Sequence, residues 1–164
     1  MKGKSLQVTI IVGGVFDAFH LAEELDKQGY LERIITSYPY VKVRNEHIRR
    51  EKTISLVMPE VFFRLGLHLG FGYNISAYFK AKLLGLLAKK RLGNCNLLFV
   101  YSGFGLEAIH FARRHGLRTI LSRSSCHIQF QKEIMQEECA RWGLAPLQED
   151  IAGSDMVLRE LEEY

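Results

Sequence analysis

The sequence predicts an α/β fold: a three-layer, Rossmann-like, doubly wound parallel sheet in a single domain. Two near-continuous apolar runs, Leu6 to Val12 and Asn96 to Ser102, have the pattern of strands buried on both faces. Each run leads through a glycine-containing turn into a segment with helical periodicity. Strands that alternate with helices form right-handed βαβ units, so the expected strand order is 3-2-1-4-5.

Three further segments complete the predicted sheet. They are Leu31 to Thr36, Thr53 to Met58 and Arg118 to Ser122. In a doubly wound sheet, ligands bind beyond the carboxyl ends of the strands, where the strand order reverses. Here that point lies between the first and fourth strands.

The helices are predicted from apolar residues that recur on one face. In the first helix this face comprises Ala18, Leu21, Ala22 and Leu25. Gly29 is well placed to end that helix in a left-handed cap. The other helices are expected over Leu106 to His115, over Ile128 to Trp142, and onward from about Ser154.

Composition limits the class of protein. A chain of 164 residues fits one domain, 1–164, and a 48% share of hydrophobic residues with charges of both signs excludes a disordered chain. The formal net charge of +4 accompanies no nucleic-acid-binding motif, so no nucleic-acid partner is expected.

Cysteine usage and hydropathy predict a cytoplasmic protein. The three cysteines fit neither a CxxC motif nor a zinc-ligand spacing, which is typical of reduced thiols. No secretory signal is recognised, and the uncharged stretch from Leu65 to Phe79 is too short to span a bilayer.

The section from about Val61 to Gly93 differs from the rest, because it is rich in leucine and aromatic residues and has only basic charges. These charges are Arg64, Lys80, Lys82, Lys89, Lys90 and Arg91. Such a section can lie on an anionic membrane surface, which would make the protein peripheral on the inner face of a membrane. The alternative is a helix packed on the sheet with a solvated lysine face.

Three loops are predicted to meet at the carboxyl edge of the sheet: 13–16, 102–105 and 123–127. Gly13 and Gly14 follow the first strand, and Ser102 and Gly103 follow the fourth. Glycines allow the backbone to approach a ligand, and amides at a helix start can receive an anion or a sugar hydroxyl. Arg123 adds a positive charge to this edge.

Several familiar chemistries lack their required residues. A dinucleotide site would need a third glycine where Ala18 stands and an acid where the second strand ends in Thr36-Ser37-Tyr38. No Walker loop is present, and both glycines of a nucleophile elbow are missing around Ser102. We therefore expect no cofactor and no metal site.

Two histidines stand close to the predicted edge. His20 shares a helical face with Asp17 and Glu24 just after the glycine loop, and His127 follows the fifth strand. A solvated or structural role and a role in the cleft both remain open for each of them.

The chain resembles the amino-terminal half of a family 4 glycosyltransferase of the GT-B type. The resemblance rests on "VTIIVGGVFDAFHLAEELDKQGYLERIITSYP", "LLFVYSGFGLEAIHFARRHGLRTILSRSSCHI", "QEECARWG" and "MVLRELEEY". It covers most of the chain and is weakest from about Val61 to Gly93. It implies a domain that carries acceptor contacts and faces a second domain across a cleft.

The resemblance implies retaining, metal-independent transfer of a sugar from a nucleotide-sugar to a lipid-linked or saccharide acceptor. Gly13 and Gly14 would lie near the donor diphosphate, and His127, as the catalytic residue, near the transferred sugar. His20, Ser102, Gly103 and Arg123 complete the predicted substrate site.

The resemblance also implies a carboxyl-terminal domain that holds most of the donor and that this chain lacks. We therefore expect a truncated or split enzyme that is inactive alone. One alternative is a non-catalytic, membrane-associated subunit of a split glycosyltransferase. Another is a stand-alone flavodoxin-like or Rossmann-type enzyme that retains a cofactor.

Overall fold

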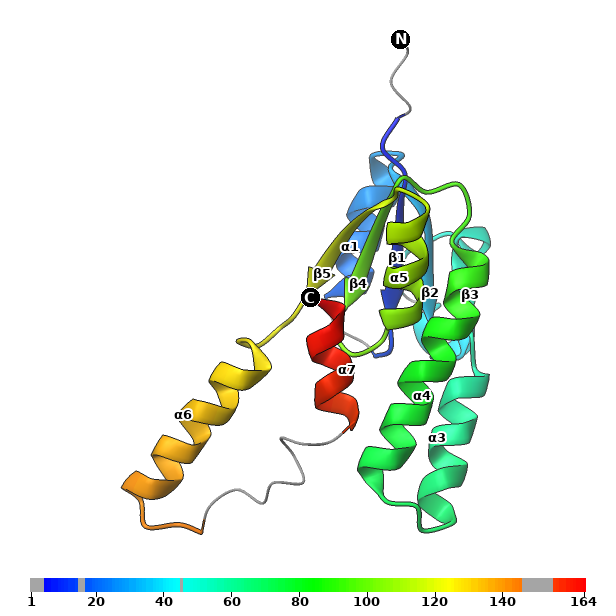
Figure 1. The fold of residues 1–164 in the computed structure, drawn as a ribbon. Coiled ribbons are helices and arrows are strands. Elements are labelled where there is room, and N and C mark those ends of the chain that lie inside the picture. The colour runs from blue at the N-terminus through cyan, green and yellow to red at the C-terminus, as the bar shows by residue number, and fades with distance from the viewer. Residues whose placement is uncertain (1–4, 15–16, 45, 146–154) are drawn as a thin grey trace.

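The computed structural model describes residues 5–14, 17–44, 46–145 and 155–164 and confirms the predicted fold class. One all-parallel sheet has the strand order β3-β2-β1-β4-β5 (Figure 1). The strands are β1 (Val8–Val12), β2 (Leu31–Thr36), β3 (Thr53–Ser55), β4 (Leu97–Tyr101) and β5 (Arg118–Ser122). In the centre of the sheet, Ile10 is in register with Ile34 of β2 and with Phe99 of β4.

Nine helices connect or follow these strands within the described residues. They are α1 (Ala18–Lys27), α2 (Tyr40–Val43), η1 (Arg50–Lys52), α3 (Met58–His68), α4 (Tyr73–Ala88), η2 (Lys89–Arg91), α5 (Leu106–Arg114), α6 (Ile128–Arg141) and α7 (Asp155–Glu163). Gly29 and Gly116 follow α1 and α5 with φ of 77° and 69°, the left-handed conformation that ends a helix without a Cβ penalty. Ser154, the predicted start of the last helix, lies outside the described residues.

The prediction for the third strand was wrong at its end. Thr53 to Met58 was expected to be extended, but β3 ends at Ser55 and Met58 begins α3. The physical reason is Pro59 in the first helical turn, where proline's fixed φ favours a helix and its missing N–H costs nothing. The first and fourth strands are slightly shorter than predicted, whereas β2 and β5 have the predicted bounds.

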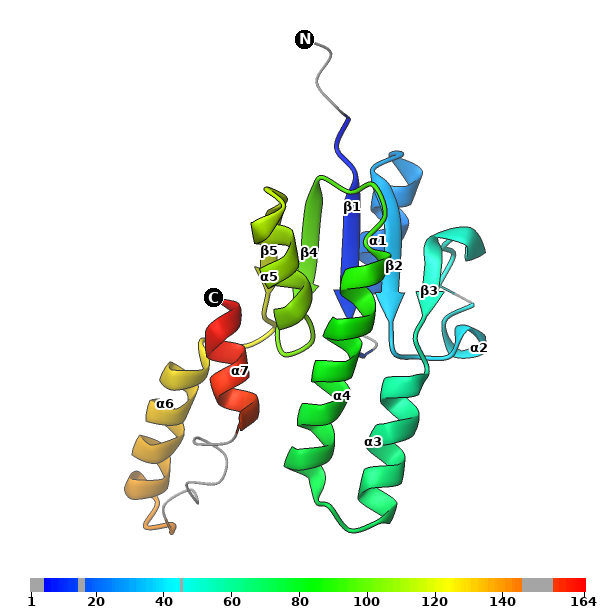
Figure 2. The ribbon, with the colours of Figure 1, turned by 45° about the vertical axis from the view of Figure 1, so that its right-hand side comes forward.

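The sheet separates two apolar cores, which gives the predicted three layers (Figure 2). On one face, Phe19 of α1 is buried against a cluster that includes Ile10 and Ile34. On the other face, Leu84 of α4 and Ile109 of α5 belong to a second buried cluster. All five residues of β1 are buried, as expected for a central strand covered on both sides.

Helices α3 and α4 form a hairpin that only partly covers the sheet. Ala81, Leu84, Gly85 and Ala88, all in the second half of α4, are buried. The first half of α4 runs beside α3 beyond the carboxyl ends of the strands (Figures 1 and 2). The part of the chain from 61 to 93 therefore combines a helix end packed in the fold with a projecting helical pair.

No helix in the described part of the chain combines the length and the apolar character needed to cross a membrane.

The two parts of the hairpin predict different costs for the same substitution. Leu84→Ala removes a fully buried side chain and should lower the free energy of unfolding by about 2–5 kcal/mol. Leu69→Ala, at a side chain that is 60% exposed, should change it by less than about 0.5 kcal/mol. Urea unfolding followed by circular dichroism measures both values, and equal losses would contradict this packing.

Candidate functional site at the carboxyl edge of the sheet

The loops after β1 and β4 touch at the point where the strand order reverses. A Cβ atom at Gly13 would overlap the ring of Phe104, so glycine is what allows these loops to approach each other. The carbonyl of Gly13 accepts a hydrogen bond of 3.0 Å from the buried Ser37 hydroxyl at the end of β2. Gly14, the next residue, is partly exposed, and Asp17 directly precedes α1.

The turn after β4 presents two backbone amides to a buried carboxylate. Gly103 has a φ of 88°, a conformation that favours glycine, and its N–H lies 2.6 Å from Oε2 of Glu163. The N–H of Gly105, the residue before α5, donates to Oε1 of Glu163 at 3.0 Å. A helix start is an anion site, and the last residue of α7 fills it with its own carboxylate.

The Glu163 carboxyl is fully buried, and this burial raises its pKa above the usual range of glutamate. The two amide hydrogen bonds act in the opposite direction, because they favour the ionised form. Arg113 stabilises the same helix end by donating to the backbone carbonyls of Glu163 and Tyr164 at 3.1 and 3.3 Å.

Two further ion pairs hold α7 against the edge. The buried Arg159 donates to both carboxylate oxygens of Glu107 on α5, at 2.7 and 2.5 Å, in a bidentate arrangement. A Cβ atom at Gly85 of α4 would overlap Glu107, so α4 and α5 approach each other closely beside the Glu107–Arg159 ion pair. Glu160 pairs with Arg123 after β5.

Arg123 lies at the predicted edge, but its guanidinium is already engaged. Besides the pair with Glu160, its Nε donates to the Cys126 carbonyl at 2.7 Å and to the Ser125 hydroxyl at 3.1 Å. A polar cavity of about 180 Å³ lies beside it. The cavity is lined by Tyr101, Ser102, Ser122, Arg123, Ser124, Ser125 and Glu160.

Ser102 and Tyr101 contribute hydroxyl groups to this edge. The buried Ser102 Oγ has no hydrogen-bond partner among the described residues. The Tyr101 hydroxyl donates to Asp17 at 2.9 Å, joining the end of β4 to the start of α1. Burial, followed by this contact with Asp17, raises the pKa of Tyr101.

The two predicted histidines lie in different surroundings. His127 is the N-cap of α6, where its Nδ1 accepts from the N–H of Gln129 at 3.4 Å. Its ring centroid is 4.8 Å from that of Tyr164, so it lies beside the end of α7. His20 is exposed in the first turn of α1 and belongs to the other side of the sheet, where α1 packs.

The structure therefore brings Gly13, Ser102, Gly103 and Arg123 to one edge, with His127 just beyond the end of β5. Sequence reasoning missed the three α7 residues that contact this edge: Arg159, Glu160 and Glu163. The available signal was the spacing of four between Arg159 and Glu163, which places them on one helix face. The described residues contain no group of three or more His, Cys, Asp or Glu side chains arranged to hold a metal ion.

Comparison of the chain with protein-family models, with curated proteins and with solved structures gives no match. The fold and the edge of the sheet thus define the class, a Rossmann-like α/β protein with a candidate site at the reversal of strand order.

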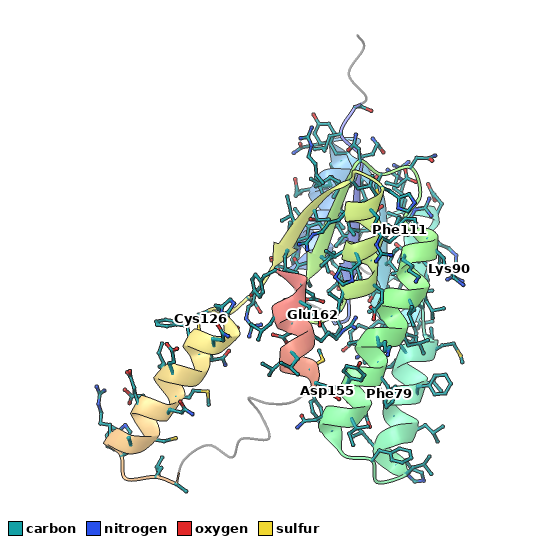
Figure 3. All side chains as sticks on the ribbon, viewed as in Figure 1. Phe79, Lys90, Phe111, Cys126, Asp155 and Glu162 are labelled. Atoms are coloured by element: carbon teal, nitrogen blue, oxygen red, sulfur yellow. The ribbon has the colours of Figure 1, made fainter. Side chains whose placement is uncertain are left out.

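The carboxylate of Glu163 predicts a specific stability effect. Glu163→Ala leaves the amides of Gly103 and Gly105 without their acceptor, so the free energy of unfolding should fall by about 2–4 kcal/mol. Glu162→Ala is the matched control, because Glu162 is the exposed neighbour on α7 (Figure 3), and should change it by less than about 0.5 kcal/mol. Urea unfolding at neutral pH measures both, and a Glu163→Ala variant as stable as its control would contradict this role.

Proposed function

We propose that the chain is the acceptor-side domain of a retaining, metal-independent glycosyltransferase, as its resemblance to family 4 of the GT-B type implies. The observation that carries the proposal is that residues of the chain itself already fill the carboxyl edge of the sheet. Gly13 leaves room for the Phe104 ring after β1, and the amides after β4 are bound by Glu163. Such an edge suits one wall of a cleft whose other wall holds most of the donor.

Ser37, directly after β2, supports a site in which a second domain holds most of the donor. Ser37 stands where a dinucleotide-binding domain has the acid that binds a ribose, and its hydroxyl is bound to Gly13. The edge therefore has no carboxylate at that position to hold a nucleoside. In the proposed enzyme, the nucleoside and most of the diphosphate contacts belong to a second domain.

The proposed reaction breaks the bond between the anomeric carbon and the diphosphate oxygen and forms a bond from that carbon to an acceptor oxygen. The acceptor's proton leaves with the diphosphate, and the anomeric configuration is retained. Backbone amides near Gly13 and Gly14 would stabilise the charge that develops on the leaving diphosphate. His127 would lie near the transferred sugar, with a lipid-linked or saccharide acceptor on the same side.

The proposed place of action is the cytoplasm or the inner face of a membrane. Cys95, Cys126 and Cys139 are free cysteines, which suits a reducing compartment.

Transfer should require a donor domain. We expect the 164-residue chain to transfer no labelled sugar from a panel of nucleotide-sugars to lipid or saccharide acceptors when it is assayed alone. Transfer should appear when a carboxyl-terminal donor domain is supplied, either fused or added separately. Robust transfer by the chain alone, or no transfer with any donor domain, would contradict the proposal.

In the complemented enzyme, His127→Ala should lower kcat by about a hundredfold or more if His127 contacts the reacting groups. His110→Ala is the matched control, because His110 is an exposed histidine on α5, and should leave kcat unchanged. Equal kcat values for the two variants would show that His127 takes no part in the reaction.

A further inference from the structure

The projecting part of the α3–α4 hairpin exposes large apolar side chains that the fold itself does not cover. They are Phe62, Leu65, Leu69, Phe71, Tyr73, Ile75 and Phe79, each between 47% and 68% exposed. Figure 3 shows Phe79 on the projecting part of α4, well away from Lys90 at the end that packs against the fold. An apolar surface of this extent on a folded domain marks an interaction site.

All of these side chains except Tyr73 line a groove of about 820 Å³ along the hairpin. The lining is apolar except for Ser76 and Lys82. The groove ends at the turn between the helices, where Phe71 lies between Gly70 and Gly72, which have φ of 82° and 75°. The most projecting part of the hairpin is thus a short, glycine-flanked turn that presents an aromatic ring.

The charged residues of the hairpin are basic, apart from Glu60 in the first turn of α3. Residues 61–93 contain no acidic residue, and Glu60, just before them, is bound by both Arg64 and Lys80, at 3.0 and 2.7 Å. Lys82 is exposed, with its Nζ 5.6 Å from the centre of the Tyr78 ring. Basic side chains therefore lie one or two helical turns from the apolar end of the hairpin, on the side nearer the sheet.

We propose that the α3–α4 hairpin inserts its apolar end into the surface of an anionic lipid bilayer, with Lys82 and Arg64 against the lipid headgroups. Charge complementarity favours lipid over a protein partner. A protein interface usually surrounds its apolar centre with polar residues that pair specifically, whereas the exposed charged side chains of this hairpin are basic and its carboxylate, Glu60, is buried. The inference goes beyond sugar transfer and stands without it.

This docking orients the rest of the molecule. The hairpin projects past the carboxyl ends of the strands (Figures 1 and 2). Gly13, Ser102 and Arg123 directly follow these ends, of β1, β4 and β5. Insertion of its end therefore directs the candidate site toward the bilayer. A substrate carried by a lipid would reach that edge without leaving the membrane surface.

Vesicle flotation tests the proposal directly. The full chain should float with vesicles of phosphatidylcholine and phosphatidylglycerol, and raising the salt concentration should weaken binding. Vesicles of phosphatidylcholine alone should bind less. The double variant Phe71→Ser and Phe79→Ser should lower the partition coefficient at least about tenfold, because two exposed apolar anchors are lost.

Phe130→Ser is the matched control, because Phe130 is 54% exposed on α6, outside the hairpin, and should leave flotation unchanged. Circular dichroism and urea unfolding verify that every variant is folded. Absence of flotation with anionic vesicles, or equal loss in the control, would overturn the proposal. Concentration-dependent dimers that the double variant abolishes, without flotation of the parent chain, would assign the hairpin to self-association instead.

Discussion

The carboxylate of Glu163 on the amides of Gly103 and Gly105 is the contact on which the candidate site depends. It joins the last turn of α7 to the turn between β4 and α5, across about 60 residues of chain. Burying a carboxylate is costly, and the two amide donors offset part of this cost only when the geometry is held. The position of α7 therefore follows from the shape of one glycine-containing turn.

The other contacts of α7 extend this constraint around the edge. Arg159 ties the helix to Glu107 on α5, and Glu160 engages Arg123 after β5. Tyr164 then lies beside the ring of His127 at the start of α6. A substitution at Glu163 would thus alter the surroundings of Arg123 and His127, although Glu163 contacts neither of them. The hairpin is held in the fold by the buried second half of α4, where the carbonyl of Ala81 also accepts from Arg159 of α7 at 3.4 Å.

The sequence was sufficient to predict the sheet, its strand order and the loops at its carboxyl edge, because periodicity and glycine positions encode them locally. Leu31–Thr36 and Arg118–Ser122 were predicted to the residue. The end of β3 was missed because Leu56 and Met58 are apolar, and apolar character alone does not separate a strand from the start of a helix.

The partners of the edge could not be predicted in the same way. Glu163 and Arg159 look like an ordinary charged helix face, and only the fold brings them to residues far away in the chain. Composition likewise identified the basic, aromatic section at 61–93. It did not show that one part of this section packs in the fold while the other part projects from it. That division arises because the hairpin extends beyond the sheet, so that Leu84 is buried in the core while Phe79 lies on the projecting part (Figure 3).

The most direct test asks whether the anion position after β4 is already occupied. Nuclear magnetic resonance can follow the amide signals of Gly103 and Gly105 while a nucleoside diphosphate is added to the labelled chain. With Glu163 as the resident acceptor, both signals should remain unchanged up to millimolar ligand. A saturable shift of both signals at micromolar ligand would contradict the central claim, since the turn would then bind the donor's phosphates itself.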